Sequence, residues 1–136
     1  MKTINYILFS LIISLSVEAQ SIEELATQVA QDQLIAYNNK DIDSFIALFA
    51  EDASVHNFGE NQAIAQGKEN IREIYAKLFA SSPNLHSQVV NRTVLGNKVL
   101  DYELITGREN SSEILKIIAI YEIENKLIKK ATFIRE

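Results

Sequence analysis

The sequence predicts an α+β domain in which three N-terminal helices pack on a curved, mostly antiparallel sheet. Three observations predict this class. Apolar residues recur at helical spacing in the first half of the chain, runs typical of strands follow from residue 85 onward, and two-residue turns separate those runs. With 136 residues and no internal repeat, linker or low-complexity segment, the chain is expected to form one domain with its own core.

The N-terminus has the features of a secretory signal peptide. A lysine precedes an apolar run at residues 7–17, and small or branched residues stand where signal peptidase would cleave after Ala19. The alternative is a membrane anchor, but a span needs about 20 apolar residues. We therefore expect a signal peptide at residues 1–19, a domain at residues 20–136, and a secreted or periplasmic protein that is free of the membrane after cleavage.

Composition limits the classes of partner. The chain has no cysteine and a net charge of −5, so an exported form would rely on its core rather than on disulfides. An acidic domain without a basic stripe is a poor nucleic-acid binder, and no nucleic-acid partner is expected. Two histidines thirty residues apart do not make a metal site. Because nucleotide and phosphate motifs are absent as well, no metal or other cofactor is expected.

Three helices are expected before residue 84. The first begins at a capping box formed by Ser21 and Glu24, and it ends at the Asn38-Asn39-Lys40 break. Asp41 can cap a short second helix, after which a strand is expected at residues 54–58. A polar loop at residues 59–67 leads to the third helix, which has the clearest apolar stripe in the chain and ends at Ser81-Ser82-Pro83.

Four strands are expected in the second half, at residues 85–95, 98–106, 113–124 and 127–135. Gly96-Asn97 and Asn125-Lys126 are predicted hairpin turns. The first turn sets a register that opposes Val94 to Val99, Arg92 to Asp101 and Val90 to Glu103.

This register assigns the residues of the first hairpin to two faces. One face carries His86, Gln88, Arg92, Asp101 and Glu103, and the other carries Leu85, Val89, Leu95, Leu100, Tyr102 and Leu104, with Asn91 and Thr93 among them. Because one face of an antiparallel sheet is normally buried, we expect the second, more apolar face to meet the helices.

The last hairpin is expected to be apolar on both faces. Ile118, Ile120 and Phe133 fall on one face, and Ile117, Ala119, Ile123, Ile128 and Ile134 fall on the other. A sheet that is apolar on both sides needs a second cover, which predicts a homodimer that pairs sheet with sheet.

Three features of the chain together resemble the nuclear transport factor 2-like superfamily: the run AYNNKDIDSFIALFAEDASV at residues 36–55, the helix start GKENIR at residues 67–72, and the four long strands. Within it, the chain is most similar to the SnoaL-like and ketosteroid isomerase-like branch. The resemblance covers essentially all of residues 20–136 and implies a cystatin-like, cone-shaped fold. It implies no single function, because this fold hosts isomerases, cyclases, dehydratases, transport factors and binding modules.

The resemblance also assigns the ketosteroid isomerase site to positions of this chain. That enzyme uses a carboxylate base, a tyrosine hydroxyl and a protonated aspartic acid. These roles fall on Asn57, Gln33 and Ala119. Amides are not bases at neutral pH and alanine has no acid, so all three roles are vacant. Enzymatic activity, of an isomerase or lyase type if any, is therefore left open.

Other titratable side chains are candidates for a general base. His56 lies beside the vacant base position, although strand alternation sends it away from Asn57 and favours a half-exposed residue. Asp101 and Glu103 form a charge cluster with Arg92. It is either a pair of carboxyl groups with separated pKa values or a cross-strand ion pair on the outer face or at a dimer interface, and the pattern favours the ion pair.

A ligand pocket is expected within the cone. Its expected lining residues are Gln33, Tyr37, Asn57, Asn91, Arg92 and Tyr102. Such a pocket suits a small, mostly apolar molecule with one or two oxygens, unless each amide only satisfies backbone groups. The sequence therefore predicts an exported domain that binds a small apolar molecule, and it leaves acid–base isomerase, dehydratase or cyclase activity open. The alternative is a non-catalytic ligand-binding or protein-interaction module.

Overall fold

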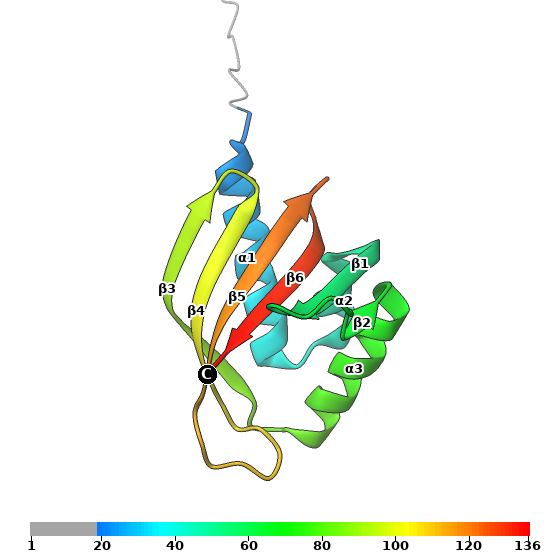
Figure 1. Cartoon of the computed structure of the whole chain (residues 1–136), viewed down its shortest axis with the longest axis vertical. Coiled ribbons are helices and arrows are strands. Elements are labelled where there is room, and N and C mark those ends of the chain that lie inside the picture. The colour runs from blue at the N-terminus through cyan, green and yellow to red at the C-terminus, as the bar shows by residue number, and fades with distance from the viewer. Residues whose placement is uncertain (1–18) are drawn as a thin grey trace, which may run out of the picture.

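The computed structural model describes residues 19–136, so nearly all of the expected signal peptide lies outside the described residues. Three helices pack on one side of a curved six-stranded sheet (Figure 1). The helices are α1 (Ile22–Asn39), α2 (Ile42–Ala47) and α3 (Lys68–Ser81), and the strands are β1 (Phe49–Asn57), β2 (Ala65–Gln66), β3 (His86–Leu95), β4 (Lys98–Thr106), β5 (Leu115–Glu124) and β6 (Leu127–Arg135). None of the described helices is long and apolar enough to cross a membrane.

The sheet order is β2-β1-β6-β5-β4-β3. The pairing of β1 with β6 is parallel, and the other pairings are antiparallel. The expected α+β class, with its three helices and mostly antiparallel sheet, is therefore confirmed. The expected start of the first strand is wrong by several residues, because β1 begins at Phe49 directly after α2.

The helix ends follow local capping. Ser21 and Glu24 form the expected capping box, in which each side chain accepts a hydrogen bond from the other residue's backbone N–H. Lys40 ends α1 in the left-handed conformation, with φ of 53°. Asp41 then caps α2 by accepting from the backbone N–H of Ser44 at 3.1 Å.

A bulge in β3 changes which residues face the helices. Near the turn, Arg92 opposes Asp101 as expected, but Val89 rather than Val90 opposes Glu103. An extra residue in one strand moves every following side chain to the other face. Ser87, rather than His86, therefore shares the helix-facing side with Glu103.

The expected orientation of the first hairpin is wrong. Asp101 and Glu103 are 1% and 5% exposed beneath the helices, whereas Tyr102 is 38% exposed on the outer face. The prediction assumed that charged groups face water. Here Arg92 and two hydroxyl groups satisfy the two carboxyl groups, which makes their burial tolerable.

A second bulge alters the last hairpin. The register shift skips Lys129, so Phe133 lies opposite Ala119 on the buried side, and Ile134 lies opposite Ile118 on the outer side. The expected faces of Phe133 and Ile134 are therefore exchanged. Ile118 stays 36% exposed on the outer face.

Candidate functional site

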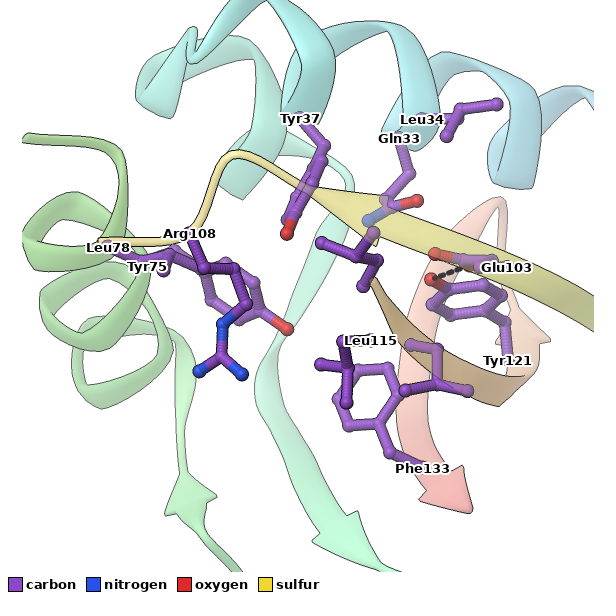
Figure 2. Close-up of a pocket in the computed structure, with 12 residues that line it drawn as sticks. Gln33, Leu34, Tyr37, Tyr75, Leu78, Glu103, Arg108, Leu115, Tyr121 and Phe133 are labelled. Atoms are coloured by element: carbon purple, nitrogen blue, oxygen red, sulfur yellow. Dashed lines mark hydrogen bonds between the residues drawn. The ribbon is translucent and has the colours of Figure 1, made fainter. Parts of the chain in front are cut away.

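A cavity of about 80 Å³ lies between α1, α3 and the concave face of the sheet (Figure 2). Side chains from both helices, three strands and the β4–β5 loop form its wall. They are Gln33, Leu34, Tyr37, Tyr75, Leu78, Glu103, Ile105, Arg108, Leu115, Ile117, Tyr121 and Phe133. The wall is mainly apolar and aromatic, with a few polar groups that converge from opposite sides.

Glu103 is the buried carboxyl group of this cavity. Its Oε2 accepts a hydrogen bond from Ser87 Oγ at 2.7 Å, and its Oε1 accepts one from the Tyr121 hydroxyl at 3.3 Å. Burial raises the pKa of Glu103, and the charge of Asp101 adds to the increase, whereas the Ser87 and Tyr121 hydrogen bonds and the Arg92 charge lower it. The net result is a carboxyl group that holds its proton to a higher pH than an exposed glutamate.

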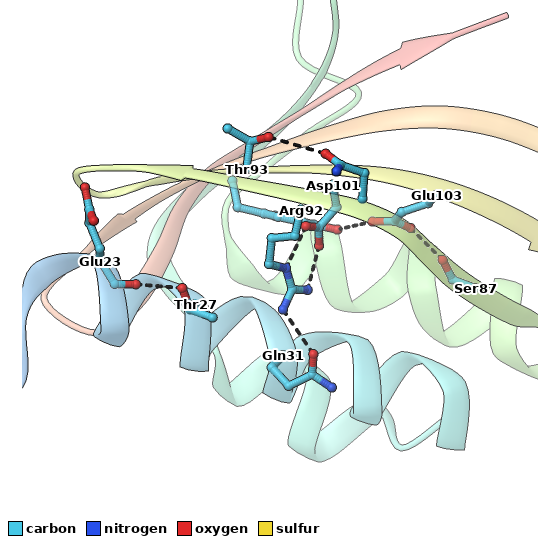
Figure 3. Close-up of polar contacts among 10 residues, drawn as sticks. Glu23, Thr27, Gln31, Ser87, Arg92, Thr93, Asp101 and Glu103 are labelled. Carbon is cyan, nitrogen blue, oxygen red and sulfur yellow. Dashed lines mark hydrogen bonds and ion pairs between the residues drawn. The ribbon is translucent and has the colours of Figure 1, made fainter.

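Arg92 neutralises the other buried carboxylate. Its guanidinium donates from Nε and from one terminal nitrogen to the two oxygens of Asp101, both at 2.7 Å, and its second terminal nitrogen donates to Gln31 of α1 at 3.0 Å (Figure 3). This fork matches the geometry of a carboxylate. Both oxygens of Asp101 are thereby bonded to Arg92, which leaves Glu103 as the carboxyl group that faces the cavity.

Asn38 positions the start of β3 beside Glu103. Its side chain accepts from the Ser87 backbone N–H at 2.8 Å and donates to the Ser87 carbonyl at 2.9 Å. The side-chain ammonium of Lys40 donates to the Leu85 carbonyl at 3.2 Å. The Asn38-Asn39-Lys40 segment, expected only as a break between helices, therefore also anchors the strand that presents Ser87.

Tyrosine hydroxyls supply donors across the cavity. Figure 2 shows the hydroxyls of Tyr37 and Tyr75 directed into it from α1 and α3. Burial raises the pKa of both residues, so both stay protonated and can donate hydrogen bonds. Tyr121 donates to Glu103, whereas the hydroxyls of Tyr37 and Tyr75 have no hydrogen-bond partner among the described residues and are available to a ligand.

Gly107 sets the direction of the loop that carries Arg108. Its φ is +74°, and a Cβ placed on it would lie 1.9 Å from the backbone oxygen of Asn84. Only glycine fits this close approach. The Ser82 hydroxyl accepts from the Glu109 backbone N–H at 2.9 Å, which fixes the loop from the other side. As a result, Arg108 reaches the cavity wall.

Family comparison agrees with this architecture. The model of the SnoaL-like domain matches residues 30–131. The chain belongs to the SnoaL-like domain family. The expected resemblance and the cystatin-like fold are thus confirmed, and no curated protein matches the chain.

Solved structures show the same fold. An uncharacterized cystatin fold protein from Novosphingobium aromaticivorans is 26% identical, with a TM-score of 0.75, and the match covers 86% of this chain and 100% of that one. A putative ketosteroid isomerase from Kribbella flavida is 17% identical, with a TM-score of 0.75 and coverage of 87% and 82%. A putative SnoaL-like polyketide cyclase from Jannaschia is 17% identical, with a TM-score of 0.72 and coverage of 88% and 90%.

The cavity of this SnoaL-like domain contains three of the expected site residues, namely Gln33, Tyr37 and Glu103. Arg92 and Asp101 lie behind Glu103, along the same buried face. The structure thus confirms the cross-strand ion pair between Arg92 and Asp101 but places it on the buried face, so its expected position on the outer face is wrong.

The other expected site residues lie elsewhere. Tyr102 and Asn91 are on the outer face, opposite each other in the register, because the charged face of the hairpin is the buried one. His56 opposes Thr132, away from the cavity, and bonds to Ser54 at 2.9 Å. Asn57 lines a separate hollow that shares Phe133 with the cavity, and its Oδ1 is buried without a partner.

Sequence reasoning missed Tyr75, Tyr121 and Arg108. Both tyrosines stand at positions that indicate core packing, and Tyr75 does pack against Phe45, with ring centroids 4.5 Å apart. Arg108 lies in a loop without periodicity, so no pattern predicted its position. Among residues 19–136, no group of three or more potential metal-binding side chains occurs.

Proposed function

We propose that this SnoaL-like domain binds a small carbonyl compound in its cavity and that Glu103 exchanges a proton with the bound molecule. One observation carries the proposal: a buried carboxyl group with a raised pKa opens on a cavity into which free tyrosine hydroxyls point from the opposite side. Buried acids of this kind in a concave site are typical of acid–base catalysts.

The size of the cavity limits the molecule. One water needs about 10–15 Å³ of such space, so a cavity of about 80 Å³ accommodates roughly five to eight non-hydrogen atoms. The apolar wall, formed by Leu78, Ile105, Leu115, Ile117 and Phe133, suits a hydrocarbon body. Larger substrates require the wall to move.

The proposed step is a proton transfer beside a carbonyl. Ionised Glu103 takes a proton from the carbon next to the carbonyl group, the C–H electron pair forms the new double bond, and negative charge develops on the carbonyl oxygen. The hydroxyls of Tyr37 and Tyr75 donate hydrogen bonds to that oxygen. Return of the proton from Glu103 to the same or another carbon completes an exchange or an isomerisation. Dehydration and cyclisation can begin with the same step.

Cyclopentanone in D₂O tests this step. The full chain is expected to accelerate the exchange of the protons beside the carbonyl for deuterium, as followed by ¹H NMR. Glu103→Gln should abolish the acceleration because an amide is not a base. Glu122→Gln is the matched control, since Glu122 lies on the same sheet but on its outer face. Exchange at the buffer rate, or full activity in Glu103→Gln, would refute the catalytic proposal.

A non-catalytic ligand-binding module is the second candidate. The observation that favours it is the pair of hydroxyl donors to Glu103, which occupies oxygens that a base would use. This alternative predicts a thermal shift with small carbonyl compounds but no exchange. Binding and exchange are separate measurements, so the two candidates give different results.

The same proposal includes a homodimer formed through the outer face of the sheet. Tyr102, Ile118 and Ile134 border a shallow apolar groove there, and water contact with such side chains is unfavourable. Analytical ultracentrifugation is expected to show a dimer that Ile118→Glu converts to a monomer. A wild-type monomer at the highest soluble concentration would exclude this dimer.

Export is also part of the proposal and is supported by the N-terminal residue pattern. Expression of the full chain in a bacterium, followed by intact mass measurement, tests it. A mature chain that begins at Gln20 is expected. Retention of all the preceding residues would refute cleavage.

A further inference from the structure

The arginines of the chain fall into two groups. Of its four arginines, Arg72 and Arg92 pair with Asp43 and Asp101. Arg108 and Arg135 have no carboxylate oxygen within 4.0 Å among residues 19–136. Unpaired surface arginines are common in proteins, so their position decides whether they have a role.

Arg108 is part of the cavity wall, and Arg135 lies just outside the cavity at the same end, next to two residues of the wall. Arg108 lies on the side of the cavity away from Glu103 (Figure 2). Arg135 opposes Ile117, a cavity residue, in the β5–β6 register. The guanidinium of Arg135 lies over the ring of Phe133, 5.8 Å from its centroid, and Phe133 is itself part of the wall.

Electrostatic effects agree with this placement. Burial raises the pKa of Tyr37, and Tyr75 and Glu103 raise it further, whereas the charges of Arg108 and Arg135 lower it. Both guanidinium groups therefore act on one hydroxyl that points into the cavity. Figure 1 shows the same convergence of the backbone, since the β4–β5 loop begins where the C-terminal end of β6 lies.

We infer that the ligand of this cavity is a small organic carboxylate, whose carboxylate group is bound by Arg108 and Arg135 at the end away from Glu103. The inference rests on the proposed function and names its substrate class. A chain with a net charge of −5 repels anions at long range, so a local pair of guanidinium groups is needed to hold one. The planar guanidinium fork matches a carboxylate.

This arrangement also orients the ligand. A carboxylate beside Glu103 would meet a second acid in a buried site, which is unfavourable. With the carboxylate at the arginine end, the apolar body lies along Leu115 and Ile117, and its other end approaches Glu103. Short keto acids and short unsaturated acids have this shape.

Crotonate and crotonamide form a matched pair of probes, because they differ only in the charged or neutral head group. Each is titrated into the full chain, and the Ile117 methyl and the arginine Nε–H signals are followed by NMR. Crotonate is expected to bind about tenfold more tightly, since charge-assisted hydrogen bonds replace neutral ones. Arg108→Gln and Arg135→Gln should each remove most of this preference, because each should weaken crotonate binding much more than crotonamide binding.

Lys98→Gln is the control for overall charge, because Lys98 is exposed at the other end of β4. It should leave the preference for crotonate intact. Equal binding of the two probes, or a preference that survives both arginine substitutions, would overturn the inference while leaving the cavity as a binding site. Absence of any Ile117 shift with either probe would overturn both the inference and the proposed binding function.

Discussion

Replacing Arg92 with glutamine is expected to lower the free energy of unfolding by about 3–5 kcal/mol, the range found when one partner of a buried ion pair is removed. The Arg92–Asp101 pair is a buried ion pair of this kind. Asp101 is 1% exposed, and both of its oxygens accept from Arg92 at 2.7 Å. Glutamine cannot supply the charge or the fork, so Asp101 would remain buried as an uncompensated anion.

Urea unfolding at neutral pH, followed by circular dichroism, measures the change. Arg72→Gln is the matched control, because its partner Asp43 has a side chain that is 81% exposed. Exposed pairs contribute at most about 1 kcal/mol. The double variant Arg92→Met with Asp101→Leu should recover most of the lost stability, since apolar residues of similar volume remove the unpaired charge.

An equal loss of unfolding free energy in Arg92→Gln and Arg72→Gln would refute this reasoning, because burial would then have no effect on how much an ion pair contributes to stability. A double variant as unstable as Arg92→Gln alone would place the loss elsewhere, for example in the contact of Arg92 with Gln31 of α1.

Three further predictions concern residues around the cavity. Burial raises the pKa of Glu103 above its ordinary 4.5, so the stabilising contribution of the protonated group is complete below pH 4.5 and is lost as the pH rises through the raised pKa. In urea unfolding, Glu103→Gln should therefore gain stability relative to wild type as the pH rises above 4.5, and a difference that is constant with pH would contradict this. Gly107→Ala should lower the free energy of unfolding by several kcal/mol, because the added Cβ would clash with the backbone of Asn84. Gly59→Ala is the control, since a Cβ there meets open space at φ of +82°, and it should lower the free energy of unfolding by about 1–2 kcal/mol. Equal losses in the two variants would show that the close approach of Gly107 to Asn84 is not fixed. Asn38→Ala removes two hydrogen bonds to the backbone of Ser87 near the start of β3 and should lower the free energy of unfolding by about 1–3 kcal/mol in thermal or urea unfolding. Asn39→Ala changes the exposed neighbouring residue and should have little effect.

The sequence predicted the elements well, because their signals are local. The Ser21 and Glu24 capping box, the Asp41 cap and the two hairpin turns each involve residues within a few positions of one another. Strands β4 and β6 match the predicted residues at both ends. The family resemblance, which depends on the same local patterns in order, was also confirmed.

The site was predicted less well, because its composition depends on the strand faces. A one-residue bulge at Val90 brings Ser87 to Glu103, and a skipped residue in β6 turns Phe133 inward. No local pattern marks either bulge, and each reverses the alternation on which the predicted faces were based.

The sequence by itself therefore determined the three helices, the four long C-terminal strands, the fold class and the family, but not the start of β1 or the short strand β2. Only the tertiary structure decided that the charged face of the first hairpin is buried. The physical reason is that burial of a carboxylate depends on partners distant in the chain, such as Arg92 for Asp101 and Ser87 for Glu103. Likewise, Arg108 reaches the cavity wall because Gly107 turns the chain, and Arg135 lies beside the cavity residue Ile117 because β6 ends there. Spacing along the sequence does not indicate that these two arginines are close to the same cavity.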